Sequence, residues 1–99
     1  MTRVKICGLT RASDVEAAVD SGADALGFIS GYINSPRNLR FDKLEELISR
    51  VPPFVDTVVV TPPWNIHRVG LNVSYCAPDI VNGQPPAQDE RGLSYRLFH

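Results

Sequence analysis

The first residues that could do chemistry are a cysteine and a lysine near the N-terminus. Cys7 ends the short run Val4-Lys5-Ile6-Cys7, and Lys5 lies two residues before it. If this run is a strand, both side chains share one face, because side chains alternate along a strand. A nearby lysine charge and the N-terminus of a following helix would favour the reactive thiolate form of Cys7. The alternative is that Cys7 is a small buried hydrophobe, as free cysteines commonly are.

Arg37 is the second candidate. It follows Asn34, Ser35 and Pro36 in residues 31–40, which show neither helical nor strand periodicity and are predicted to form a loop. The planar guanidinium of an arginine suits a carboxylate or a phosphate. The alternative is an arginine that is simply solvated, which is also what we expect of Arg40.

Neither a metal nor a cofactor is predicted. His67 and His99 have no cysteine, aspartate or glutamate near them at a metal-ligand spacing. The glycines do not have the spacing of a phosphate-binding or dinucleotide-binding loop. Cys7 and Cys76 are expected to be free thiols, because nothing else in the sequence indicates an oxidising compartment.

Three strands and two helices are predicted to position the candidate residues. The strands are residues 4–7, 25–29 and 57–61; the second is nearly all apolar and the third is β-branched throughout. The helices are residues 14–21 and a second one from about 43 to 51. Capping arrangements are expected at their starts, Ser13 with Glu16 and Asp42 with Glu45. Gly22 is expected to close the first helix in the left-handed conformation, and Pro52-Pro53 to end the second.

The alternation of strands and helices indicates an α/β fold with right-handed βαβ units and a parallel sheet. Ligand sites in such folds lie at the carboxyl ends of the strands, so Cys7 and Arg37 are predicted to lie at the same edge. Residues 62–99 contain two adjacent proline pairs and no sustained periodicity, and they are predicted to form an irregular tail.

Length and composition narrow the possible functions. The chain has 99 residues, whereas a (β/α)₈ barrel typically needs about 250, so a complete barrel does not fit. With a formal net charge of -1 and no basic stripe, nucleic acid is not an expected partner. No long apolar run suggests a signal peptide or a membrane span, and a cytoplasmic location is expected by default.

The segment Val4-Lys5-Ile6-Cys7-Gly8-Leu9-Thr10 resembles the opening of the phosphoribosylanthranilate isomerases of tryptophan biosynthesis, whose signature is K-[IV]-C-G-[IL]-[TK]. The resemblance continues through Ser21-Gly22-Ala23-Asp24-Ala25-Leu26-Gly27-Phe28, then Ser35-Pro36-Arg37, and then Pro52-Pro53-Phe54-Val55. It covers about residues 2–61, and residues 62–99 do not match the family. It implies that these residues form the first three strands and two helices of a TIM barrel.

The resemblance also implies an activity and its residues. These isomerases convert N-(5-phosphoribosyl)anthranilate, a small phosphorylated substrate, into its 1-deoxyribulose isomer by an Amadori rearrangement without cofactor or metal. Cys7 aligns with the general base, and Arg37 with the arginine that contacts the anthranilate group. The family's general acid, an aspartate on a later strand, has no counterpart here, since the surroundings of Asp79 and Asp89 do not match. The family's phosphate-binding loops follow the seventh and eighth strands.

Two hypotheses about the chain therefore stand. In the first, it is a truncated or frame-shifted isomerase, inactive alone and able to self-associate through an open sheet edge. In the second, it is a noncatalytic module that binds an anion or a protein partner. An isomerase assay distinguishes them.

Overall fold

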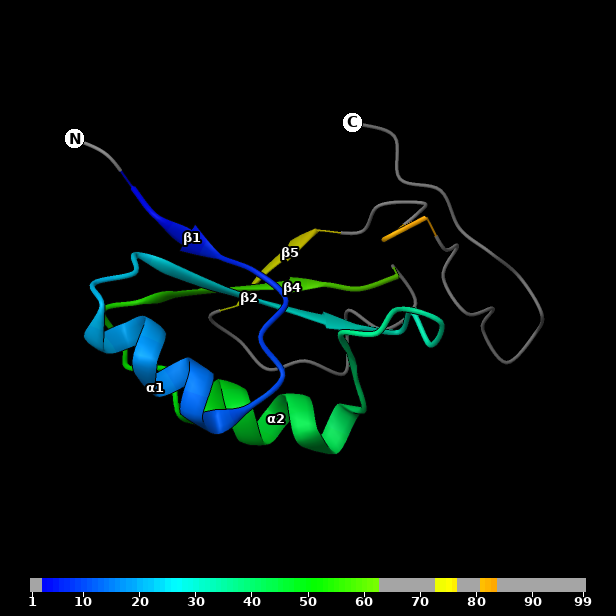
Figure 1. Cartoon of the computed structure of the whole chain (residues 1–99), viewed down its shortest axis with the longest axis horizontal. Coiled ribbons are helices and arrows are strands. Elements are labelled where there is room, and N and C mark those ends of the chain that lie inside the picture. The colour runs from blue at the N-terminus through cyan, green and yellow to red at the C-terminus, as the bar shows by residue number, and fades with distance from the viewer. Residues whose placement is uncertain (1–2, 63–72, 77–80, 84–99) are drawn as a thin grey trace.

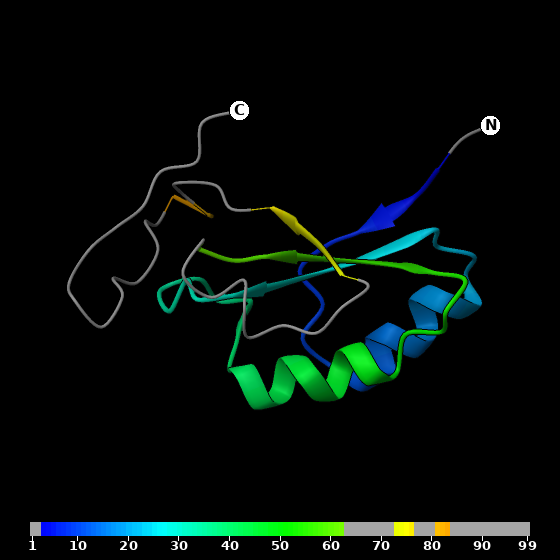
Figure 2. The ribbon, with the colours of Figure 1, turned by 180° about the vertical axis from the view of Figure 1, so that it is seen from behind.

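The computed structural model describes residues 3–62, 73–76 and 81–83. This part of the chain forms a parallel β-sheet with both helices on one face, as Figures 1 and 2 show from opposite sides. The elements, in chain order, are β1 (Lys5–Ile6), α1 (Ala12–Asp20), β2 (Ala25–Ser30), β3 (Asn38–Leu39), α2 (Phe41–Ser49), β4 (Asp56–Val60) and β5 (Ser74–Cys76).

The sheet confirms the predicted parallel α/β arrangement. Its order is β1-β2-β4-β5, and every strand pairing among the described residues is parallel. The short strand β3 pairs with the carboxyl end of β2, whereas β1 pairs with its amino end. Both lie at the same edge of β2, because β4 takes the opposite edge. Two expectations were wrong. Residues 31–40 contain β3, and the predicted irregular tail contains β5. Strands of two and three residues are too short to produce a periodic pattern.

Helix α1 begins two residues before the predicted start and does not use the predicted capping box. Its N-cap is Arg11, which makes no side-chain cap hydrogen bond. Instead, Arg11 donates to the carboxylate of Asp14 from Nε at 2.9 Å and from Nη2 at 3.3 Å. The helix ends at Asp20, one residue before the predicted end, and the predicted closing role of Gly22 is confirmed. Gly22 has φ of +88°, and the N–H of Ala23 donates to the carbonyl of Ala18 at 3.1 Å, as in a Schellman motif.

Helix α2 also begins two residues early, at Phe41. Its N-cap Arg40 makes no side-chain cap hydrogen bond, so the capping role expected of Asp42 is wrong. Asp42 instead lies 3.7 Å from Nε of Arg40 in an exposed ion pair. The helix ends at Ser49, just before Pro52, which cannot donate the backbone hydrogen bond that a further turn would need.

The main hydrophobic core lies between the sheet and the helices. Leu26, Phe28 and Val59 are fully buried on the strands that the helices cover. The helices contribute Val15, Ala18, Leu44 and Leu47 to the same cluster. Because paired residues in neighbouring strands project to the same side of a sheet, the residues between these buried positions must face the opposite side.

We call that opposite side the open face; it carries Lys5, Ala25, Gly27, Ile29, Val58 and Val60. A second, smaller hydrophobic cluster covers this face near the carboxyl ends of β2 and β4, where Ile29 and Val60 are buried together with Tyr32 and Val81. Val81 is far along the chain from the other three. The open face is therefore covered near the carboxyl ends of β2 and β4, whereas Lys5 near its amino end is exposed.

Candidate functional site

The candidate site lies where β1 ends. Cys7 follows β1 directly and is exposed as a free thiol. The next residue, Gly8, has φ of +80°, a conformation that other L-residues rarely adopt. The N–H groups of Gly8 and Leu9 both donate to the carbonyl of Gly27, at 3.0 Å and 3.2 Å. The chain therefore turns away from the sheet immediately after Cys7, and β2 holds that turn in place.

Cys7 lies against β2 on the open face. The register pairs Lys5 with Ala25 and Ile6 with Leu26, which puts Cys7 opposite Gly27. A Cβ placed on Gly27 would lie 2.8 Å from Sγ of Cys7. The predicted shared face of Lys5 and Cys7 is thereby confirmed. The alternative in which Cys7 is a buried hydrophobe is wrong, because the residue is exposed.

Arg37 extends from the neighbouring loop onto the turn that follows Cys7. A Cβ placed on Gly8 would lie 2.6 Å from Cδ of Arg37, 3.2 Å from Nη1 and 3.4 Å from Nε. The arginine side chain thus covers the bare Cα of Gly8, the residue after Cys7. The prediction that Cys7 and Arg37 lie at the same edge of the sheet is confirmed, and the glycine allows this close approach.

The loop that presents Arg37 is held by polar residues that the sequence reasoning did not single out. The Oγ of buried Ser35 accepts from the N–H of Arg37 at 3.3 Å, and Asn82 donates to the same oxygen from Nδ2 at 2.9 Å. Asn38, the first residue of β3, accepts from the N–H of Tyr32 through Oδ1 at 2.9 Å. The sequence contained a signal for this role of Ser35, because a loop serine commonly accepts a hydrogen bond from the backbone N–H two residues further along the chain.

Arg37 has no carboxylate partner among the described residues, since the ion pairs there involve other cations. The side chain is on an exposed residue and keeps its planar fork available to an anion from solution. The arrangement therefore combines a thiol with a guanidinium that can bind a carboxylate or a phosphate. No group of three or more metal-ligating side chains occurs within residues 3–62, 73–76 and 81–83. His67, His99, Asp79 and Asp89 lie outside the described residues.

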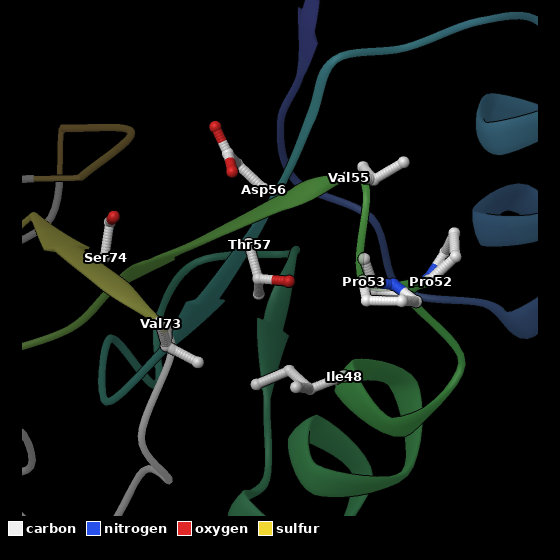
Figure 3. Close-up of a pocket in the computed structure, with 9 residues that line it drawn as sticks. Ile48, Pro52, Pro53, Val55, Asp56, Thr57, Val73 and Ser74 are labelled. Carbon is white, nitrogen blue, oxygen red and sulfur yellow. The ribbon is translucent and has the colours of Figure 1, made fainter.

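The groove in Figure 3 lies at the other end of the sheet. It has a volume of about 600 Å³ and is lined by the end of α2, the Pro52-Pro53 turn and the beginnings of β4 and β5. Val55, Thr57 and Val73 contribute to its walls. In parallel α/β folds the amino ends of the strands serve stability, and ligands bind at the carboxyl ends. The candidate site is therefore Cys7 with Arg37 at the carboxyl ends of the strands, and not this groove. Within the described residues, no helix is long and apolar enough to cross a membrane.

Curated relatives of this chain are isomerases. No family model matches it. It is 45% identical over 82 residues to the N-(5'-phosphoribosyl)anthranilate isomerase of Halorubrum lacusprofundi, covering 82% of this chain and 38% of the relative. It is 40% identical over 100 residues to the corresponding protein of Geotalea daltonii, covering 99% of this chain and 48% of the relative. Both alignments extend into residues 62–99.

Solved structures give the same result for the fold. The phosphoribosyl anthranilate isomerase of Thermotoga maritima matches with a TM-score of 0.58 and 41% identity, over 64% of this chain and 30% of that one. A phosphoribosyl anthranilate isomerase in complex with reduced 1-(o-carboxyphenylamino)-1-deoxyribulose 5-phosphate matches with a TM-score of 0.57 and 43% identity, over 61% and 30%. The α/β sheet and two helices thus correspond to part of a TIM barrel. The chain spans less than half the length of the two curated relatives, and over that part it belongs to the phosphoribosylanthranilate isomerase family.

Proposed function

We propose that this chain carries the base and the carboxylate-binding arginine of a phosphoribosylanthranilate isomerase site. The observation that supports the proposal most is the position of Arg37 on Gly8, next to Cys7. It brings a thiol and a guanidinium together at the carboxyl ends of β1 and β2, where TIM-barrel enzymes bind substrate. The reaction is the Amadori rearrangement of N-(5-phosphoribosyl)anthranilate to 1-(2-carboxyphenylamino)-1-deoxyribulose 5-phosphate.

Cys7 is the proposed general base. The rearrangement needs an acid to open the furanose ring, giving a Schiff base, and a base to remove the proton from C2, giving an enolamine that becomes the ketone. Cys7 is exposed on the open face, within reach of a substrate that approaches from the carboxyl ends of the strands. Lys5 shares that face and adds a positive charge on the same side as the thiol.

Arg37 is the proposed binding group for the anthranilate carboxylate. A guanidinium forms two parallel hydrogen bonds to a carboxylate, which fixes orientation as well as position. Cδ and two guanidinium nitrogens of Arg37 lie over Gly8, so the arginine is held at the residue after the proposed base, which acts on the ribose portion of the same substrate. One complex of this chain and one substrate molecule would therefore engage both residues.

The chain alone is proposed to lack turnover. In the family that this chain resembles, the general acid is expected on a later strand and the phosphate-binding loops after the seventh and eighth strands. The chain spans 38% of one curated relative and 48% of another. Residues 73–76 and 81–83, which lie beyond β4, contain no carboxylate that could act as the acid. Substrate binding without rearrangement is the expected behaviour.

Two measurements on the expressed chain test this proposal. The first is an isomerase assay with N-(5-phosphoribosyl)anthranilate, in which turnover would overturn the inactive-fragment view. The second is the alkylation rate of Cys7 with and without anthranilate, which should protect the thiol in the parent chain but not in Arg37→Gln. Folded protein that shows neither turnover nor protection, yet binds a macromolecular partner specifically, would support the noncatalytic module instead.

The sheet edge also bears on solution behaviour. β1 lies at one end of the strand order and β5 at the other, so each has a neighbour on one side only in that order. Such edges present unpaired backbone groups to other chains. We propose that the chain self-associates through them, which sedimentation analysis over a range of concentrations would detect.

A further inference from the structure

Gly27 occupies a position where its own backbone does not require glycine. It lies inside β2, paired with Val58 of β4, and it is absent from the positive-φ residues of the described chain. A glycine in a strand interior weakens the strand, because it loses more conformational freedom on folding and packs no side chain. Such a glycine commonly marks a place where another group approaches the backbone closely.

The group that approaches Gly27 is Cys7. A Cβ on residue 27 would lie 2.8 Å from Sγ of Cys7, 3.1 Å from its Cα and 3.2 Å from its Cβ. All three nearest atoms belong to this one residue. Rotation of the thiol would relieve the shortest contact but not the contact with Cα, which moves only with the backbone.

The carbonyl of Gly27 holds the same segment from a second direction. It accepts from the N–H of Gly8 at 3.0 Å and from the N–H of Leu9 at 3.2 Å. These bonds prevent the end of β1 from moving away to make room for a methyl group without losing backbone hydrogen bonds. The thiol is therefore confined between the bare Cα of Gly27 and the turn at Gly8.

We propose that Gly27 is a positioning residue for Cys7, holding the thiol against β2 and beside Arg37. This inference deepens the proposed function and rests on it, because it gives Gly27 a role in the placement of the proposed base. Alanine at position 27 would displace the thiol from β2 while leaving the chemical groups of the site unchanged. Alanine at position 27 would therefore change the position of the Cys7 thiol and not its chemical nature.

The test compares two alkylating reagents on the full chain with Cys76→Ser, which leaves Cys7 as the only thiol. Iodoacetate is an anion and iodoacetamide is neutral, so the ratio of their rates reports positive charge near the thiol. One unit charge within about 7 Å in water changes such a ratio by about threefold. Arg37→Gln gives the value for a thiol without that charge. Gly27→Ala is expected to lower the ratio to the value of Arg37→Gln.

The matched control is Ala25→Val. It adds bulk to the same strand and the same face, opposite Lys5 and away from the thiol. Its ratio should equal that of the parent. A Gly27→Ala chain that is folded by circular dichroism and keeps the parent ratio would overturn the positioning role.

A stability comparison keeps the proposal testable if Gly27→Ala folds poorly. Cys7→Gly removes the Sγ and Cβ contacts and leaves only the contact to Cα. Gly27→Ala should therefore lower Tm less in the Cys7→Gly background than in the parent. An equal decrease in both backgrounds would overturn the proposal. Neither readout depends on turnover, so a failure of Cys7 as the base would leave both results intact.

Discussion

Gly8→Ala should separate the position of Arg37 from the stability of the fold. Gly8 has φ of +80°, and an alanine in the left-handed region costs about 1–2 kcal/mol. The added Cβ would lie 2.6 Å from Cδ of Arg37, which is the far part of a flexible side chain. We expect the arginine to swing away, so that the clash adds little to the loss of stability but removes the guanidinium from Cys7.

Gly22→Ala is the matched control, because Gly22 has φ of +88° and nothing within 4 Å of the position of a Cβ. Both variants should lose about 1–2 kcal/mol, or roughly 4–16 °C in Tm for a chain of this size. Only Gly8→Ala should lower the iodoacetate-to-iodoacetamide ratio at Cys7, by about threefold. A Gly8→Ala chain with the parent ratio would refute the reasoning, and so would one that loses far more stability than Gly22→Ala.

Three further predictions concern the fold. Leu47→Ala, at a fully buried position of α2, should lower the free energy of unfolding in urea by about 2–5 kcal/mol, whereas Ile33→Ala, at a residue that is 71% exposed, should leave it nearly unchanged. Equal losses in the two variants would contradict the burial of Leu47 in the core. The hydrogen bond from Lys43, followed by the Lys43 charge and a hydrogen bond from Arg50, lowers the pKa of Glu46. A carboxyl group with a lowered pKa stabilises the fold at pH values above its unfolded pKa, so Glu46→Gln should lower the urea midpoint slightly at pH 7. The difference between the variant and the parent should vanish as the pH falls through the folded pKa of Glu46. A difference that grows in acid would contradict this prediction. Val81→Asp should expose Ile29 and Val60 and increase binding of a hydrophobic dye, whereas Asn34→Asp, at an exposed position, should not.

The two helices and the strands β2 and β4 could be predicted because each has enough length to show its pattern. The apolar run of β2 and the β-branched run of β4 indicated buried parallel strands, and Gly22 indicated the end of α1. The helix starts were displaced by two residues because Arg11 and Arg40 occupy the N-cap positions without capping through their side chains. β3 and β5 have two and three residues, and pairing with β2 and β4 defines them more than their own sequence does.

The candidate site was predictable only in part. The parallel topology requires residues that follow β1 and β2 to meet at one edge, so the proximity of Cys7 and Arg37 followed from the element order. The contact itself did not, because it depends on the positive φ of Gly8 and on the loop that Ser35 holds. Gly27 was part of the family motif, but its contact with Cys7 depends on the register between β1 and β2, which spans distant parts of the chain.

The most direct test of the central claim is a chimaera in which residues 3–61 of this chain replace the corresponding segment of the Thermotoga maritima isomerase. That enzyme supplies the rest of the barrel, and this chain is 41% identical to the part of the enzyme that it matches. The account predicts isomerase turnover in the chimaera, with Cys7→Ala lowering kcat by about 10²–10⁴-fold and Arg37→Gln raising KM. A folded chimaera that keeps its full turnover after Cys7→Ala would contradict the claim that Cys7 is the base.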